Sequence, residues 1–239
     1  MTLNYKKICL WAMVISYPFV LCLAAGLFFV MLLTLPYTYS PGSDDEPIGE
    51  VEACDLMPSG TVNGHDYVDL GLSVKWATCN VGASEPKDGG NDYAWGETGT
   101  KASYTKENCS TYARHLGDIN ATSLDVARTE WGSPWRMPTE AECEELFYNC
   151  VWTWGELGGT LGCMVTSMKN GNTVFLPADT WMDHNNDTYL CGAYWSSTPF
   201  SDDDAHAVNI HFTKHGVTAT KNSRDYRYKS MKVRPVTAK

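Results

Sequence analysis

The chain lacks the short motifs that mark common enzyme sites. It contains no G-x-S-x-G nucleophile elbow, no H-E-x-x-H zinc motif, no P-loop and no Rossmann glycine pattern. Its six histidines are scattered along the sequence rather than set in a recognisable constellation. These absences predict a protein with no catalysis of its own.

Paired cysteines and excess basic charge are also missing. None of the nine cysteines forms a C-x-x-C pair, which argues against a zinc knuckle or a thioredoxin-like redox site. Seven of them follow the first 35 residues, and an odd number leaves at least one thiol unpaired within the chain. The formal net charge is −10, so nucleic acid is an unfavourable partner.

Charge is absent altogether from Ile8 to Leu35, and Lys6 and Lys7 stand directly before this stretch. The run exceeds the ~20 residues needed to cross a bilayer, and also the roughly 7–15 apolar residues of a cleaved signal peptide. We interpret residues 1–36 as a signal-anchor helix, with an unusually long signal peptide as the alternative. The lysines favour a cytoplasmic N-terminus. The remainder is therefore expected in the cell envelope, extracytoplasmic, and either anchored to the membrane or secreted.

Residues 37–61 are rich in Pro, Gly, Ser and acidic residues, which predicts a disordered linker. A single domain is expected over 62–239. Its first strand is predicted at Val68–Trp76, where apolar residues alternate with Asp69, Gly71, Ser73 and Lys75.

Two helices are predicted next. Ser123 is the expected N-cap of the first, which Gly132 closes. The second carries a Thr139–Glu142 capping box and continues to Cys150.

The rest of the chain predicts strands. Asn170-Gly171 indicates a hairpin between Met164–Met168 and Thr173–Leu176. Alternation over Val208–Phe212 predicts another strand, and a turn at His215-Gly216 would place His211 opposite Thr220 and Thr213 opposite Thr218. Met231–Val236 is the expected last strand. Two helices between an early strand and a late, irregular antiparallel sheet define an α+β domain.

Six phrases occur in a fixed order: VDLGLSVKWATCNVG, YAWGE, WRMPTEAE, FLPA, YWSST and KVRPV. Together they resemble the Fibrobacter major paralogous (FISUMP) domain, which is abundant in exported proteins of Bacteroidetes-type bacteria. The resemblance implies a C-type-lectin-like fold, in which the early strand pairs with the terminal one. It names no ligand. Trp76, Trp95, Trp135, Trp195 and Arg234 lie inside the phrases, and we expect them to hold the core.

Residues suited to ligand binding gather near the C-terminus, where Tyr, Trp, Arg and Asn provide adaptable contact surface. The candidate ligand-binding residues are Trp181, Asp183, His184, Asn185, Asn186, His206, Asn209, His211, Asn222, Arg224, Tyr226, Arg227 and Tyr228. Arg224 to Tyr228 are expected to be exposed. The acidic segment 183–187 resembles the opening of a calcium loop, but Thr188 and Tyr194 stand where its glycine and closing glutamate belong. No cofactor is therefore predicted, with calcium as a secondary possibility.

The sequence thus predicts an exported, membrane-tethered module, anchored by its N-terminal helix, that binds a protein or glycan through its C-terminal surface. One alternative is a structural envelope or pilus-associated subunit. Another is an oxidase of the formylglycine-generating type, whose paired-cysteine arrangement the sequence does not show.

Overall fold

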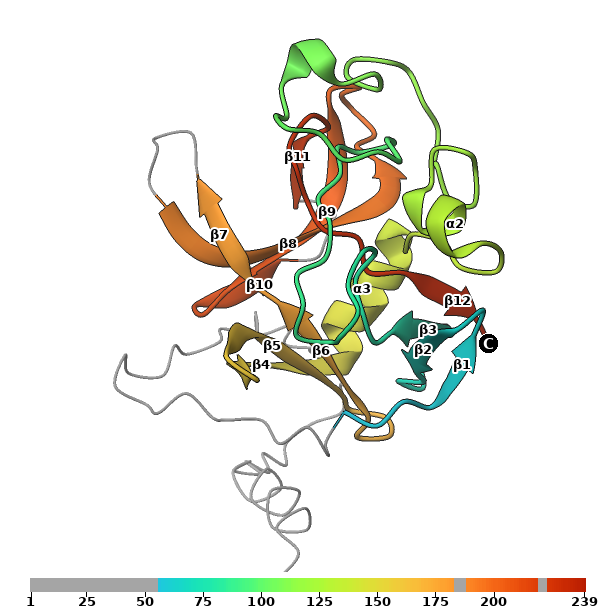
Figure 1. The fold of residues 1–239 in the computed structure, drawn as a ribbon, viewed down its shortest axis with the longest axis vertical. Helices are drawn as coiled ribbons and strands as arrows, with labels where there is room; N and C mark the ends of the chain where they lie inside the picture. The colour runs from blue at the N-terminus through green and yellow to red at the C-terminus, as the bar shows by residue number, and fades with distance from the viewer. Residues whose placement is uncertain (1–55, 183–187, 219–222) are drawn as a thin grey trace, which may run out of the picture. The chain divides into compact units, whose positions relative to one another are not determined.

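The computed structural model describes residues 56–182, 188–218 and 223–239, which fold mainly into β-sheets with two α-helices (Figure 1). Three sheets are present in this part of the chain. The first has the order β1 (Gly60–Val62), β2 (His65–Val68), β3 (Val74–Ala77) and β12 (Val236–Ala238). The second has the order β4 (Cys150–Leu157), β5 (Thr160–Ser167) and β6 (Thr173–Pro177). The third has the order β10 (Gly216–Thr218), β9 (His206–Thr213), β8 (Thr188–Pro199) and β7 (Asp179–Met182), with β11 (Arg224–Tyr226) also pairing with β9.

The predicted pairing of the chain's early strand with its last one is confirmed. β12 runs antiparallel to β3, with Val236 opposite Trp76, and Figure 1 shows the two side by side near the C-terminus. The contact extends one residue further, because the Ala77 N–H donates to the Pro235 carbonyl at 2.9 Å. The described residues are therefore mainly β-sheet with two α-helices, and the last strand pairs with an early one.

The prediction of one continuous strand over Val68–Trp76 is wrong. Val68 ends β2 and lies opposite Trp76 in β3, so the chain reverses direction between them. Gly71 makes this possible with a φ of +71°, and its N–H donates to Asp69 Oδ1 at 2.8 Å. The alternating apolar side chains are nevertheless all buried, because the loop folds back over the same core. In this segment, the alternation of apolar and polar residues therefore reflects burial of side chains and not strand conformation.

The two predicted helices are present. α3 (Glu140–Asn149) has the predicted capping box, in which Thr139 Oγ1 accepts from the Glu142 N–H and the Glu142 carboxylate accepts from the Thr139 N–H. α2 (Val126–Trp131) ends at Gly132 as predicted, but its N-cap is Asp125 rather than Ser123. A carboxylate is an equally good cap, and Asp125 also bonds Ala121 and Met137, which sequence spacing does not reveal.

The later strands agree with the sequence only in part. The predicted bounds of the last strand, Met231–Val236, are wrong, because β12 begins at Val236 and the start of the predicted strand makes only isolated bridges. β7 and β11 were not predicted. β5 and β6 form the predicted hairpin. The chain leaves the second helix for β4 at Cys150, a strand that was not predicted. The turn between β9 and β10 lies at Lys214-His215 rather than His215-Gly216, so Thr218 pairs with His211. This shift of two residues keeps each side chain on its predicted face.

The core contains aromatic residues of the six sequence phrases. The side chains of Trp76, Trp95, Trp135 and Trp195 are all at most 1% exposed, as predicted. α3 lies against β4, β8 and β9. A short 3-10 helix, η2 (Lys106–Asn108), interrupts the long connection between β3 and α2.

Arg234 is as buried as the tryptophans and holds three segments together. Its guanidinium donates to Asn80 Oδ1 at 2.7 Å and to the carbonyls of Ala77, Thr78 and Phe175. Burial lowers the pKa of this guanidinium. The prediction that Arg234 belongs to the core is confirmed.

The predicted anchor and most of the predicted linker precede the described residues, although β1 begins at Gly60, inside the predicted linker. Among residues 56–182, 188–218 and 223–239, no helix has the length and hydropathy needed to span a bilayer.

Candidate functional site

The C-terminal surface is built on β11, a three-residue strand at the edge of its sheet. β11 pairs antiparallel with β9, so that Asp225 lies opposite Ala207. Alternate residues of a strand face opposite sides. Arg224 and Tyr226 are exposed, whereas Asp225 between them is half-buried. The strand therefore presents a cation and an aromatic ring to solvent.

Four rings form a continuous row at this edge, here named the aromatic ladder: His206, Tyr226, Tyr228 and Tyr112. The ring centroids of His206 and Tyr226 are 4.1 Å apart, and those of Tyr226 and Tyr228 are 5.3 Å apart with nearly parallel planes. Tyr112 meets Tyr228 edge-on at 5.5 Å. Such contacts fix the rings relative to one another, while Tyr226 remains 40% exposed.

Charged groups surround the aromatic ladder. The Arg224 guanidinium lies 4.3 Å from the ring centre of Phe200, which restricts where its charge can point. His206 Nδ1 lies 2.6 Å from Asp203 Oδ2. A hydrogen bond from the Ala205 N–H, together with His206, holds the pKa of Asp203 below its ordinary value. Burial raises the pKa of Asp225 behind the ladder. The surface thus combines rings with both signs of charge.

The prediction that residues 224–228 are exposed is confirmed for Arg224 and Tyr226 only. Asp225 and Tyr228 are half-buried, and Arg227 is not part of the exposed surface at all. Its side chain is fully buried and lies 4.4 Å from the ring centre of Trp95. Nε donates to the His206 carbonyl at 3.0 Å, and Nη1 donates to the Arg114 carbonyl at 2.7 Å. Burial lowers the pKa of this guanidinium. Arg227 therefore anchors β11 and the loop that carries Tyr112.

Two other candidates point inward or are only half-exposed. Asn209 is 3% exposed, and its Oδ1 accepts from Ser223 Oγ at 2.6 Å, so this candidate does not contribute to the surface. His211 is half-buried beside Tyr189, and burial lowers the pKa of its imidazole. Both belong to β9, which β11 partly covers.

The side chains of the remaining candidates lie outside the described part of the structure. Trp181 belongs to β7, and only its backbone is described. The others lie outside the described residues: Asp183, His184, Asn185, Asn186 and Asn222. The possible calcium loop falls in the same gap. Within the described ranges, no group of three or more His, Cys, Asp or Glu side chains could hold a metal ion.

The structure adds residues that the sequence did not suggest. Tyr112 comes from a connection more than a hundred positions before its partner Tyr228, and no local pattern signals that contact. Phe200 and Asp203 lie in the turn between β8 and β9. Their signal was the acidic run Asp202-Asp203-Asp204 flanked by Phe200 and His206, which places charge and rings in one turn.

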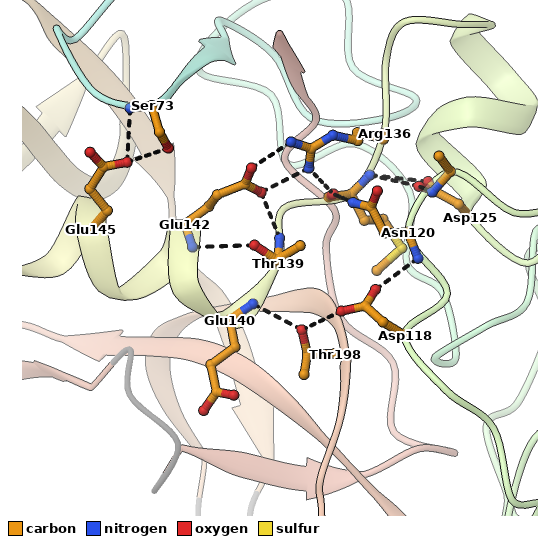
Figure 2. Close-up of polar contacts among 12 residues, drawn as sticks. Ser73, Asp118, Asn120, Asp125, Arg136, Thr139, Glu140, Glu142, Glu145 and Thr198 are labelled. Atoms are coloured by element: carbon orange, nitrogen blue, oxygen red, sulfur yellow. Dashed lines mark hydrogen bonds and ion pairs between the residues drawn. The ribbon is translucent and has the colours of Figure 1, made fainter.

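A second cluster of carboxylates surrounds the start of α3 and is the main alternative site (Figure 2). Arg136 makes two hydrogen bonds to Glu142, at 2.8 and 2.5 Å, and Glu142 also caps the helix. Thr198 Oγ1 accepts from the Glu140 N–H and donates to Asp118 Oδ2, joining β8 to the loop before α2. These bonds link three segments of the chain around one helix end.

The carboxylates of this second cluster are occupied by the protein itself. Asp125 is fully buried and accepts from the N–H groups of Ala121, Arg128 and Met137. Burial raises its pKa despite these bonds. For Glu142 the balance is reversed: burial opposes ionisation, but the bonds from Arg136 and Thr139 hold its pKa below the usual value. The cluster is a structural clamp, referred to below as the α3 clamp.

A cavity of about 60 Å³ lies between β7, β8 and residues 230–232, and it is large enough to hold water. Lys232 borders it, and its Nζ lies 3.1 Å from Asp92 Oδ1 and 3.4 Å from Asp179 Oδ2. The ammonium thus occupies the position between the two carboxylates.

The described cysteines do not form a redox pair. Their six thiols are all free: Cys79, Cys109, Cys143, Cys150, Cys163 and Cys191. Burial raises the pKa of Cys163 to about 12, which keeps that sulfur in the weakly reactive thiol form.

Comparisons with protein-family models, with curated proteins and with solved structures found no match to this chain.

Proposed function

We propose that this chain is a non-catalytic recognition module that binds a protein or glycan through the aromatic ladder and Arg224. The observation that carries the proposal is the row of rings outside the core, with Tyr226 exposed between His206 and Tyr228. Flat amphipathic rings provide contact area at low entropic cost, and they are enriched where proteins bind ligands.

The frame behind the ladder supports the proposal. Arg227 fixes the strand from within, so the outward rings are positioned before any ligand arrives. Preorganisation lowers the entropic cost of binding. The rings are thus presented as a rigid surface at the edge of the sheet.

The six sequence phrases and the pairing of β3 with β12 support a C-type-lectin-like, FISUMP-type fold. Together with the uncharged N-terminal segment, they support a location on the outer side of a bacterial membrane, within the cell envelope. This placement and the fold family form part of the proposal.

The test is a ligand screen followed by substitution. The full chain in detergent is screened on a glycan array and in a pull-down from envelope extract. Binding of the ligand found is then measured with the protein immobilised. Tyr226→Ala and Arg224→Ala should each weaken binding about tenfold or more. Tyr148→Ala removes a tyrosine that is 62% exposed on α3, and is the matched control.

Two results would count against the proposal. A ligand that binds Tyr226→Ala and Arg224→Ala as well as it binds the unchanged protein uses another surface. A screen that yields no ligand, while the chain copurifies with one envelope complex, favours the structural alternative.

A further inference from the structure

β4 is an unusually long and regular edge strand. It spans eight residues, whereas the edge strands β1, β10 and β12 span three each. Its pairing with β5 continues without a bulge from Cys150 to Leu157. It contains neither proline nor lysine. Natural sheets protect exposed edges with short strands, bulges, lysines or prolines, and β4 has none of these.

The free main-chain groups of β4 can be assigned from one hydrogen bond. The Met168 N–H donates to the Asn149 carbonyl, which makes Asn149 and Met168 a hydrogen-bonded pair. Such pairs alternate along an antiparallel ladder. In the register of β4 and β5, Val151, Thr153 and Gly155 therefore bond toward β5. It follows that Trp152, Trp154 and Glu156 direct their N–H and C=O groups away from it.

Within the described ranges, no residue outside β5 bonds to the main chain of 151–157. Apolar side chains are also exposed at this end of the sheet. Tyr148 is 62% exposed, Val151 46% and Met168 61%. Unpaired strand groups beside exposed apolar side chains are characteristic of a surface that pairs with another strand.

We propose that β4 pairs antiparallel with β4 of a second copy of this chain, joining the two three-stranded sheets into one. The even-numbered residues of β4 direct their N–H and C=O groups away from β5, so they must lie opposite the even-numbered residues of the second copy to form hydrogen bonds. Every register that places an even-numbered residue opposite an odd-numbered one is therefore excluded.

Two of the remaining registers have the largest overlap, one with Thr153 and one with Trp154 on the two-fold axis. We choose Thr153, because that register pairs every even-numbered residue of the strand, from Cys150 to Glu156, whereas the other leaves Cys150 without a partner. Trp152 then lies opposite Trp154 of the other copy. The main-chain N–H of each tryptophan donates to the C=O of the other.

The side chains of β4 suit this register. Thr153 is exposed and faces its own counterpart, and a Thr–Thr pair is a favourable cross-strand contact. Val151 faces Gly155, which has no side chain to obstruct it. The only charged residue of the strand is Glu156. Six residues along a strand separate the two copies of Glu156 by roughly 20 Å, so they do not repel each other. This charge pattern fits a second copy better than an acidic partner.

The pairing is independent of the aromatic ladder, because β4 and β11 belong to different sheets. A single strand pair is a small interface, so the association should be reversible and depend on concentration. Confinement of the chain to a membrane would raise the effective concentration of the second copy.

The test uses charge at the two-fold axis in the full chain, purified in detergent and measured by analytical ultracentrifugation. Thr153→Lys places two lysines opposite each other, and Thr153→Glu places two glutamates. Each should weaken the dimer about tenfold or more. An equimolar mixture of the two variants should restore dimers, because lysine then faces glutamate. Ala102→Lys adds the same charge at an exposed loop position, and it should leave the dimer unchanged.

A photo-crosslinking residue at position 153 gives a second readout, and its expected product is a crosslinked pair of identical chains. Three results would overturn the proposal: an unchanged protein that is monomeric at ~100 μM, a Thr153→Lys dimer as strong as the original, or a crosslink only to a different protein. If mixing the two variants fails to restore dimers, the proposed register is wrong. Circular dichroism of each variant shows whether the monomer is still folded.

Discussion

The aromatic ladder and the α3 clamp are both rich in polar and charged residues, yet they have opposite roles. In the α3 clamp, the carboxylates of Asp125 and Glu142 accept bonds from the protein's own N–H groups, and little bonding capacity remains for a ligand. In the ladder, Tyr226 and Arg224 stay exposed and make mainly ring contacts. Residue type alone does not distinguish the two regions. The distinction is whether each group's partners are internal.

The largest expected effect concerns a buried group that performs the same kind of structural task as the α3 clamp. Arg234→Met should lower the free energy of unfolding by about 3–5 kcal/mol, because it leaves the Asn80 amide oxygen and three buried carbonyls without their hydrogen-bond donor. Arg224→Met, on the ladder surface, should change it by less than about 0.5 kcal/mol. Urea unfolding followed by circular dichroism measures both. Equal losses of unfolding free energy in Arg234→Met and Arg224→Met would contradict this distinction between buried and exposed arginines.

A smaller loss is expected inside the α3 clamp. Asp125→Ala removes the N-cap of α2 and leaves the N–H groups of Ala121 and Met137 without their acceptor. It should cost about 3 kcal/mol in the same unfolding measurement. Asp125→Asn, which retains one acceptor oxygen, should cost less. The exposed Asp202→Ala is the control, and a comparable loss there would contradict the assignment.

The smallest effect depends on pH. Because the pKa of Glu142 lies below its usual value of 4.5 in the folded protein, its ionised form stabilises the fold. This contribution is complete above pH 4.5 and is lost as pH falls through the lowered pKa. Glu142→Gln should cost about 1–2 kcal/mol at pH 7 and should lose less stability than the original protein between pH 5 and pH 3. Parallel pH profiles of the two proteins would show that Glu142 does not act this way.

Much of the frame could be predicted from sequence because its signals are local. The Thr139–Glu142 capping box and the Asn170-Gly171 hairpin each depend on residues only a few positions apart, and both were found. The reversal between Val68 and Trp76 was not, because alternating burial fits both a strand and a loop that folds over the core. Only Gly71 hinted at the turn.

The candidate site was harder to predict because it depends on contacts between distant segments. Tyr226 and Tyr228 were identified by residue type and position, but Arg227 between them has the same surface-like character and is fully buried. Its partners at Trp95 and Arg114 come from the long connection before α2. Tyr112 was missed for the same reason. A single sequence carries no local record of such pairings.

In the short stretch around β11, residues that hold the strand in place lie directly beside residues that are exposed to solvent. Ser223 and Arg227 tie it to β9 and to the loop that carries Tyr112, while Arg224 and Tyr226 are exposed to solvent. Exchange of the outward side chains leaves those ties in place. Under the proposed function, a few substitutions at these positions would change what the surface binds without changing how the chain folds.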